Sequence, residues 1–125
     1  MAREGGLLNW QWRGYSRNHR DRLNLVLHIV AVPAFVAGML ATVSLALKGF
    51  YYGAAAAFVF AIVAFALQGI GHKREAQPPE PFDGPGDFVA RVFAEQFITF
   101  PRFVLSGNWM RNLAGRAEQD DNRHG

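Results

Sequence analysis

Residues 25–47 read "LVLHIVAVPAFVAGMLATVSLAL", a run that carries no formal charge. A helix rises about 1.5 Å per residue, so a run of this length can cross a hydrocarbon core of about 30 Å. A second run, residues 53–71, reads "GAAAAFVFAIVAFALQGIG", and its many alanines allow its backbone to approach the first helix closely. A chain of 125 residues has little room to bury two such helices in a soluble core. The sequence therefore predicts an all-α fold built on a transmembrane helical hairpin.

The composition is that of a single membrane domain with its charge outside the apolar runs. Half of the residues are apolar and 18% are charged, compared with about 25% in ordinary soluble domains. The formal net charge is +3, but the arginines flank apolar segments, which favours the lipid bilayer over nucleic acid as a partner. The chain has no cysteine, which excludes disulfides, thiol catalysis and cysteine-ligated metal sites. No long apolar core precedes a cleavage site near the N-terminus, so no signal peptide is expected.

The charges around the hairpin predict its orientation. Five arginines precede or begin the first run: Arg3, Arg13, Arg17, Arg20 and Arg22. Lys73 and Arg74 follow the second run, whereas the short connection, which predicts a tight turn in an aromatic belt, carries only Lys48. The positive-inside rule then places both termini in the cytoplasm, at the inner or plasma membrane of a bacterium or the endoplasmic reticulum of a eukaryote.

The segments outside the hairpin are polar or amphipathic. Residues 1–20 form a basic arm, which is either a disordered tail or lies at the membrane interface through its tryptophans. Residues 76–87 are rich in proline and glycine and cannot continue a helix, and Asp87 is a candidate N-cap for an amphipathic or partly inserted helix over 88–107. That helix carries four polar or charged residues and an interrupting proline: Arg91, Glu95, Gln96, Arg102 and Pro101. The first two are spaced to pair along one face. A disordered tail is expected over 111–125.

Polar residues at one end of the hairpin predict a site. In an antiparallel hairpin the start of the first helix lies beside the end of the second, which brings His28 and Asn24 near His72 and Glu75. An ionisable residue inside a membrane segment is costly and by default marks a functional site. Imidazole with carboxylate is the ligand set of non-haem iron, and zinc uses similar ligands, so the sequence leaves the metal open.

The position of His19 leaves its role open. On one continuous helix His19 and His28 would lie roughly 13 Å apart along the axis, too far to share an ion. They can share one only if the chain breaks near Asp21, and otherwise His19 serves a second ion or orients a substrate. Pro33 permits a kink just beyond His28, and the glycines before His72 predict a loosened helix end. The fourth histidine, His124, lies in the tail.

Two motifs resemble the 2-hydroxy-palmitate dioxygenase-like membrane proteins, a family long catalogued as a domain of unknown function. The motifs are "NHRDRLNLVLHIVAVP" and "QGIGHKRE", and eight residues carry the resemblance: Tyr15, His19, Asn24, His28, Pro33, Gly71, His72 and Glu75. The resemblance spans roughly residues 13–107. Many members have two adjacent histidines where this chain has Asn18 and His19.

The resemblance implies an Fe(II)-dependent dioxygenase of α-oxidation that shortens 2-hydroxy fatty acids by one carbon and consumes dioxygen. It implies His19, His28 and His72 as metal ligands. Glu75 would be an acid ligand or a base, and Asn24 would orient a histidine or the substrate carboxylate. The apolar hairpin would hold the acyl chain of a fatty-acid-like substrate.

Two other functions and the oligomeric state stay open at this point. The chain can be a non-catalytic membrane protein whose histidines are structural, or a haem-binding hairpin with His28 and His72 as axial ligands. Two spans and one amphipathic helix bury little surface, so the sequence also leaves open a homodimer. It does not define the substrate or its chain length.

Overall fold

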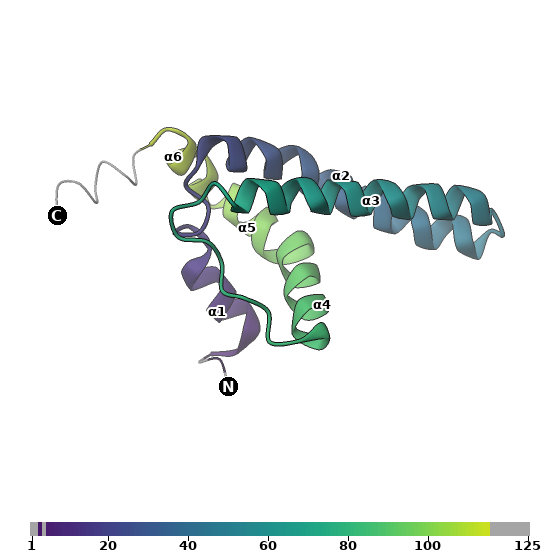
Figure 1. The fold of residues 1–125 in the computed structure, drawn as a ribbon, viewed down its shortest axis with the longest axis horizontal. Helices are drawn as coiled ribbons and strands as arrows, with labels where there is room; N and C mark the ends of the chain where they lie inside the picture. Colours follow the sequence, from purple (N-terminus) through teal and green to yellow (C-terminus); the bar gives the residue numbers. More distant parts are fainter. Residues whose placement is uncertain (1–2, 4, 116–125) are drawn as a thin grey trace, which may run out of the picture.

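The fold is all-α, as the sequence predicts. A computed structural model of the chain describes residue 3 and residues 5–115, and helix is the only regular secondary structure in that part. In chain order the elements are α1 (Gly6–Tyr15), α2 (Arg22–Leu47), α3 (Tyr51–His72), α4 (Pro85–Ala94), the π-helical turn η1 (Glu95–Thr99), α5 (Phe100–Leu105) and α6 (Asn108–Leu113). Figure 1 shows α2 and α3 side by side as a long hairpin, with the other helices gathered at its base.

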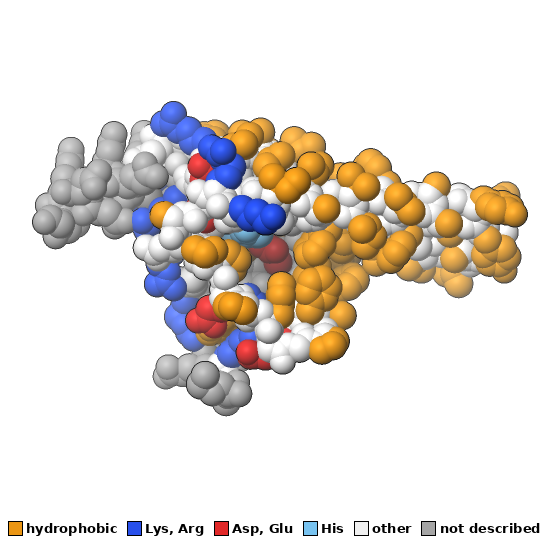
Figure 2. Space-filling view, viewed as in Figure 1, with side chains coloured by type: hydrophobic (Ala, Val, Ile, Leu, Met, Phe, Trp, Pro, Cys, Tyr) orange, Lys and Arg blue, Asp and Glu red, His pale blue; other side chains and the backbone are white. Residues whose placement is uncertain are grey.

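The hairpin is long and apolar enough to cross a membrane, which confirms the predicted helical runs at 25–47 and 53–71. The most apolar windows of α2 and α3 are only 28% and 22% buried within the protein, so these helices are not the enclosed core of a soluble domain. Their outward side chains form an almost continuous apolar surface (Figure 2). An exposed apolar surface of this extent is solvated more favourably by lipid than by water.

Small residues close the seam between α2 and α3. A Cβ atom built on Gly38 would lie 3.0 Å from the Cβ of Ala61 and 3.1 Å from the carbonyl oxygen of Ala57. Ala54, Ala61 and Ala64 are buried. Helices without bulky side chains at their contact approach closely and gain dispersion contacts, which is how helices associate where apolar burial supplies little driving force.

The tip of the hairpin is the tight turn that the sequence predicts. Gly49 has φ +84°, in the left-handed region that favours glycine. The Phe50 N–H donates a hydrogen bond to the Leu45 carbonyl at 2.9 Å, which closes the end of α2. Tyr51 and Tyr52 are exposed there, as expected of an aromatic belt.

The helix after the proline-rich segment begins earlier than expected, and its predicted N-cap is wrong. Gly84 is the N-cap of α4, and Pro85 occupies the first helical turn, where its missing N–H is not needed. The Asp87 carboxylate instead accepts a hydrogen bond from the Asp83 N–H at 3.0 Å and pairs with Arg3 at 2.7 Å. The interaction with Arg3 and the hydrogen bond from Asp83 hold the pKa of the Asp87 carboxyl well below its usual range.

The predicted pair of Arg91 with Glu95 is also wrong. The Arg91 guanidinium donates hydrogen bonds to the carbonyl oxygens of Glu80 and Pro81 and to the Asp87 carboxylate. Glu95 begins the π-helical turn η1, in which the Phe100 N–H reaches the Glu95 carbonyl. The widened turn carries the helix past Pro101 and points Glu95 towards the hairpin.

The termini of the described part fold against the base of the hairpin. The N-terminal arm contains α1, whose Tyr15 packs edge-on against Phe103, with ring centroids 5.1 Å apart. The Trp109 indole of α6 donates to the Leu25 carbonyl at 3.0 Å. The disordered tail predicted over 111–125 is therefore wrong for the end of α6, and residues 116–125, with His124, lie outside the described residues.

The sequence predicts that the end of α3 loosens at the glycines before His72, and this prediction is wrong. α3 is helical through His72, and α2 is helical through Pro33. Gly71 is instead a point of close approach, because a Cβ atom there would overlap the Asn24 Oδ1 and lie 3.1 Å from the Asn24 Cγ. A Cβ atom on Gly69 would meet open space.

We expect Gly71→Ala to lower the free energy of unfolding by about 1–3 kcal/mol, because it overpacks against Asn24. Gly69→Ala is the matched control two residues away, and it should leave stability unchanged or raise it by up to about 1 kcal/mol. Chemical unfolding in detergent micelles measures both. Equal stability of the two variants would show that α2 and α3 are not in close contact at Gly71.

Candidate metal centre

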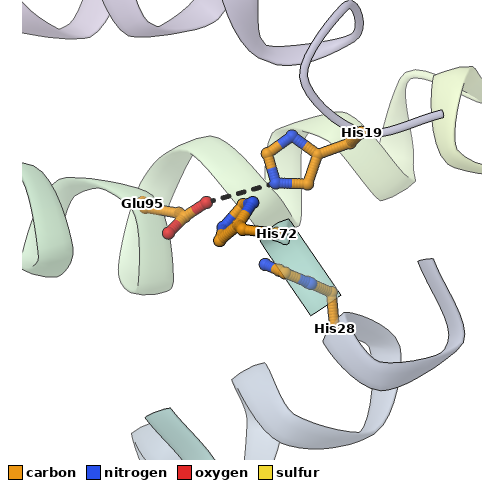
Figure 3. A group of neighbouring side chains, drawn as sticks. All are labelled: His19, His28, His72 and Glu95. Carbon is orange, nitrogen blue, oxygen red and sulfur yellow. Dashed lines mark ion pairs between the residues drawn. The ribbon is translucent and has the colours of Figure 1, made fainter. Parts of the chain in front are cut away.

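Four side chains from four parts of the chain meet at the base of the hairpin (Figure 3). His19 comes from the turn between α1 and α2, His28 from the start of α2, His72 from the end of α3, and Glu95 from η1. Each offers one ligand atom, and these atoms all lie within 4.8 Å of one another. The structure thus brings together the three histidines that the sequence singles out, and adds a carboxylate from another segment.

The three imidazoles form a nearly equilateral triangle. The His19 ring centroid lies 4.9 Å from those of His28 and His72, which are themselves 4.7 Å apart. The ring planes are steeply inclined to one another, by 73° to 86°. The Glu95 Oε2 lies 3.5 Å from the His19 Nε2. Ring nitrogens arranged in this way can reach one ion without stacking against each other.

Backbone carbonyls fix the orientation of two of the rings. A carbonyl oxygen can only accept, so the Nδ1–H of His19 donates to the Tyr15 carbonyl at 2.8 Å. In the same way the Nδ1–H of His28 donates to the Asn24 carbonyl at 3.0 Å. Each of these bonds leaves the Nε2 of its ring as a lone-pair donor, which is the tautomer a metal ligand requires.

Three buried ring nitrogens in this group have no hydrogen-bond partner. They are the Nε2 atoms of His19 and His28 and the Nδ1 atom of His72. His19 and His28 are at most 1% exposed. A buried polar atom without a partner costs about 1–3 kcal/mol, and a metal ion would satisfy all three. The donor set therefore fits a metal ion that takes nitrogen and oxygen ligands.

A break in the chain between α1 and α2 allows His19 to share the site with His28. α1 ends at Tyr15, and α2 begins at Arg22 with Asp21 as its N-cap, whose carboxylate accepts from the Asn24 N–H at 3.0 Å. The turn folds His19 back towards the hairpin. The sequence leaves several alternatives open for His19. The structure shows the one in which the chain breaks near Asp21, so that His19 lies beside His28.

The side-chain amide of Asn112 in α6 holds this turn in place. It donates to the carbonyl oxygens of Ser16 at 2.9 Å and His19 at 2.8 Å. Asn112 is 3% exposed, so both hydrogen bonds lie in a protected environment. The backbone on both sides of the His19 ring is thus fixed by a helix that sequence reasoning assigned to the tail.

Glu75 lies outside the ligand group and supports it. Its carboxylate accepts hydrogen bonds from the Arg20 N–H at 2.7 Å, the Asp21 N–H at 3.0 Å and the Asn24 Nδ2 at 2.6 Å. These bonds tie the end of α3 to the turn that carries His19. Asn24 contributes twice, since its side chain holds Glu75 and its carbonyl orients His28. Glu75 and Asn24 thus hold the residues of the group in position and are not themselves members of it.

Glu95 is the residue that sequence reasoning missed. Burial raises the pKa of its carboxyl, but the interaction with His19 and the nearby imidazole charges outweigh burial and lower the pKa to about 2. The carboxylate is therefore ionised and ready to bind a cation. The available signal was its isolation, because it is the one acidic residue in the apolar stretch 88–107. Its spacing to Arg91 suggested an ordinary helical ion pair and concealed this signal.

A pair of buried amides fixes Glu95 against the hairpin. Gln68 of α3 and Gln96 of η1 donate to each other's side-chain oxygens at 2.8 and 2.7 Å, and both are at most 1% exposed. The Gln96 Nε2 also lies 3.3 Å from the Glu95 Oε1. The amide pair thus sets the register of η1 on α3 and, with it, the place of the carboxylate.

Tyr15 presents a buried hydroxyl beside the group. Its ring stacks on the His19 ring with centroids 3.8 Å apart and planes 18° apart. Burial and the neighbouring Glu95 raise the pKa of the Tyr15 phenol well above its ordinary value, so the phenol stays protonated. The hydroxyl has no hydrogen-bond partner among the described residues, which leaves it as a donor for a ligand.

The haem hypothesis does not fit this geometry. Two axial histidines must face each other across a porphyrin. Here the His28 and His72 rings are only 4.7 Å apart, and His19 lies beside both of them. No room exists for a porphyrin between the two rings.

A comparison with protein-family models, curated proteins and solved structures found no match to this chain. The site is therefore assigned from its own geometry.

We expect Glu95→Gln to weaken cobalt(II) binding by at least about 10-fold and to shift the visible absorption bands, because a charged ligand is lost from the ion. Glu75→Gln, the matched control, should lower affinity through misplacement of His19 but leave the band positions unchanged. Titration of the metal-free protein followed by visible spectroscopy measures both. Identical spectra for wild type and Glu95→Gln would exclude Glu95 as a ligand.

Proposed function

We propose that this protein is a membrane-embedded, Fe(II)-dependent dioxygenase that acts on 2-hydroxy fatty acids. The observation that carries the proposal is the set of three buried, unpartnered imidazole nitrogens facing a carboxylate. The resemblance of the two histidine motifs to the 2-hydroxy-palmitate dioxygenase-like proteins supplies the substrate class.

The ligand chemistry supports iron. Non-haem iron oxygenases use two histidines and one carboxylate and leave coordination positions open for dioxygen and substrate. This site offers one further histidine, and the open-sided arrangement of His19, His72 and Glu95 along a cavity leaves a face for a substrate. Zinc accepts similar ligands, so the test must also identify which metal the purified protein binds.

The position of the site suits a lipid-derived acid. The ligands lie at the base of the hairpin, where membrane-spanning segments meet the polar part of the protein (Figure 2). A fatty acid in a leaflet has its carboxylate at headgroup depth, which is the level proposed for the metal. We place both termini on the cytoplasmic side, because the arginines cluster at this end of the hairpin.

The proposed reaction balances without an added reductant. A 2-hydroxy acid, R–CH(OH)–COOH, and O₂ yield R–COOH, CO₂ and H₂O, so the substrate loses four electrons and dioxygen gains four. Iron, when bound, supplies the redox chemistry that activates dioxygen. The protein contributes the ligands, excludes water through the burial of His19 and His28, and offers the Tyr15 hydroxyl as a hydrogen-bond donor to the substrate.

The second candidate is a non-catalytic membrane protein whose histidines are structural. It predicts that the hairpin keeps its stability and its cellular role when the ring nitrogens are removed. The unpartnered nitrogens weigh against it, since a structural imidazole normally satisfies its polar atoms within the protein.

Protein purified without oxygen should contain about one equivalent of iron, and it should consume one O₂ per CO₂ released from 2-hydroxystearate. His28→Ala and His72→Ala should each lose most of the iron and at least 100-fold in rate, because removing a ligand costs several kcal/mol at the transition state. His124→Ala, in the C-terminal tail, is the control and should behave as wild type. Elemental analysis and an oxygen electrode give the measurements.

The opposite results are equally clear. Stoichiometric zinc with no oxygen uptake would make the site a zinc site. A protein that folds and supports its cellular role after loss of His28 and His72 would favour the structural alternative.

A further inference from the structure

A cavity of about 910 Å³ lies beside the candidate metal centre, between α1, the end of α3, residues 77–82 and α4. Its volume is in the range of small-molecule sites, about 300–1,000 Å³. His19, His72 and Glu95 form part of its wall, so an occupant reaches the metal ligands directly.

The lining is divided between apolar and basic side chains. Its aromatic lining residues are Trp10, Phe65, Phe82 and Phe88. Its basic lining residues are Arg13, Arg17 and Arg91, and the metal-centre residues His19, His72 and Glu95 complete the polar part of the lining. A molecule that fills such a cavity has an apolar body and an anionic head.

Three phenylalanines of the cavity lining contact one another in a row. The Phe65 ring of α3 meets the Phe88 ring of α4 edge-on, with centroids 5.7 Å apart, and Phe88 meets Phe82 at 4.9 Å. Phe88 and Phe82 are 38% and 45% exposed. Each pair of rings meets edge to face rather than in a parallel stack, and Phe88 is partly exposed, so a small rotation of its side chain can open a passage between α3 and α4.

The apolar surface of the hairpin continues onto α4. Figure 2 shows hydrophobic side chains running from the hairpin over the adjoining part of the molecule below it, where α4 lies crosswise (Figure 1). Val89 and Phe93 of α4 are exposed, as are Phe97 and Ile98 of η1. A crosswise amphipathic helix beside two spans lies in the membrane interface. The passage between Phe65 and Phe88 therefore opens towards lipid.

The opposite route, past residues 77–82, is held closed. Arg91 donates hydrogen bonds to the carbonyls of Glu80 and Pro81 at 2.7 and 3.1 Å. Its guanidinium also lies over the rings of Phe82 at 4.4 Å and Trp10 at 5.0 Å. These four interactions hold residues 80–82 and Trp10 against α4. The seam of the hairpin is closed as well, because Gly38 and Ala61 leave no space between α2 and α3.

Arg17 is the cation in the cavity wall that is available to a ligand. It is exposed, and it forms no ion pair with any residue in the described part of the chain. Arg91, by contrast, is engaged with Asp87 and two carbonyls. A guanidinium binds a carboxylate with two parallel hydrogen bonds, which gives both affinity and orientation.

We infer that Phe65 and Phe88 form a lateral portal from the bilayer and that Arg17 binds the carboxylate of a single-chain acid held in this cavity. This inference rests on the proposed function for its chemistry but concerns binding alone. The acyl chain then lies between α1, α3 and α4, and the hairpin serves as the membrane anchor.

The test uses metal-free protein in lipid nanodiscs, so that it is independent of iron and dioxygen. The probe is stearate with a nitroxide on its chain, which quenches nearby tryptophans. Trp10 lines the cavity, and the other tryptophans do not. We expect saturable quenching that disappears in Trp10→Phe, and much weaker quenching by the methyl ester of the same probe. Equal quenching by acid and ester would overturn the role of a cation.

Arg17→Gln should weaken binding of the acid about 10-fold, the loss of one charge-assisted interaction at an exposed site. Arg17→Lys should recover part of it. Lys73→Gln is the control, because it removes the same charge from an exposed residue that does not line the cavity. If Arg17→Gln and Lys73→Gln bind equally well, Arg17 is not the carboxylate site.

Phe88→Ala should raise the association rate of the probe several-fold, because it widens the portal. Phe97→Ala is the matched control, since Phe97 is also 38% exposed and does not line the cavity. Stopped-flow quenching measures both rates, and equal rates would exclude the portal. Binding without iron-dependent oxidation would contradict the proposed function alone, and oxidation without Trp10 quenching would contradict this inference alone.

Discussion

The hydrogen bonds of the Glu75 carboxylate hold together the parts on which the site depends. Glu75 lies just after α3 and accepts from two backbone N–H groups of the turn before α2 and from the side chain of Asn24. The Asp21 carboxylate adds an ion pair with Arg74 at 2.9 Å. A buried carboxylate with several donors is strongly stabilised, whereas one that loses them is costly. These contacts hold the start of α2 against the end of α3. They thereby fix the relative positions of His19, His28 and His72.

At the same end of the hairpin, regular helices give way to irregular segments that place polar side chains. Each irregular feature there has a specific compensation. The turn at residues 16–21 is held by the Asn112 amide, and the π-helical turn at Glu95 is held by the pair of Gln68 and Gln96. Backbone carbonyls of the first two helices orient two imidazoles. Backbone groups that leave a regular helix need other hydrogen-bond partners, and here protein side chains supply them.

The sequence predicted the hairpin because its signal is local. Two uncharged runs and a short aromatic connection suffice for α2 and α3, and their bounds agree with the structure within a few residues. The antiparallel arrangement then brought His28 beside His72 without any tertiary detail. Glu95 could not be found this way, because its orientation depends on one extra residue in a helical turn, and a regular 3.6-residue period placed it beside Arg91. Glu75 was found but given another role, since sequence cannot distinguish a ligand from the carboxylate that holds the ligand loop.

The energetic cost of the histidine group argues that the group does more than pack. Three buried nitrogens without partners cost about 1–3 kcal/mol each, and a protein of this size has a total stability of about 5–15 kcal/mol. Leucine or phenylalanine at these positions would avoid that cost and would suit the apolar surroundings of Phe100 and Phe103. The fold keeps three imidazoles together, two of them oriented by backbone carbonyls, and a ligand bound between them would offset the cost of their unpartnered nitrogens. A metal ion would do so, because one bound cation would satisfy all three nitrogens and the Glu95 carboxylate together.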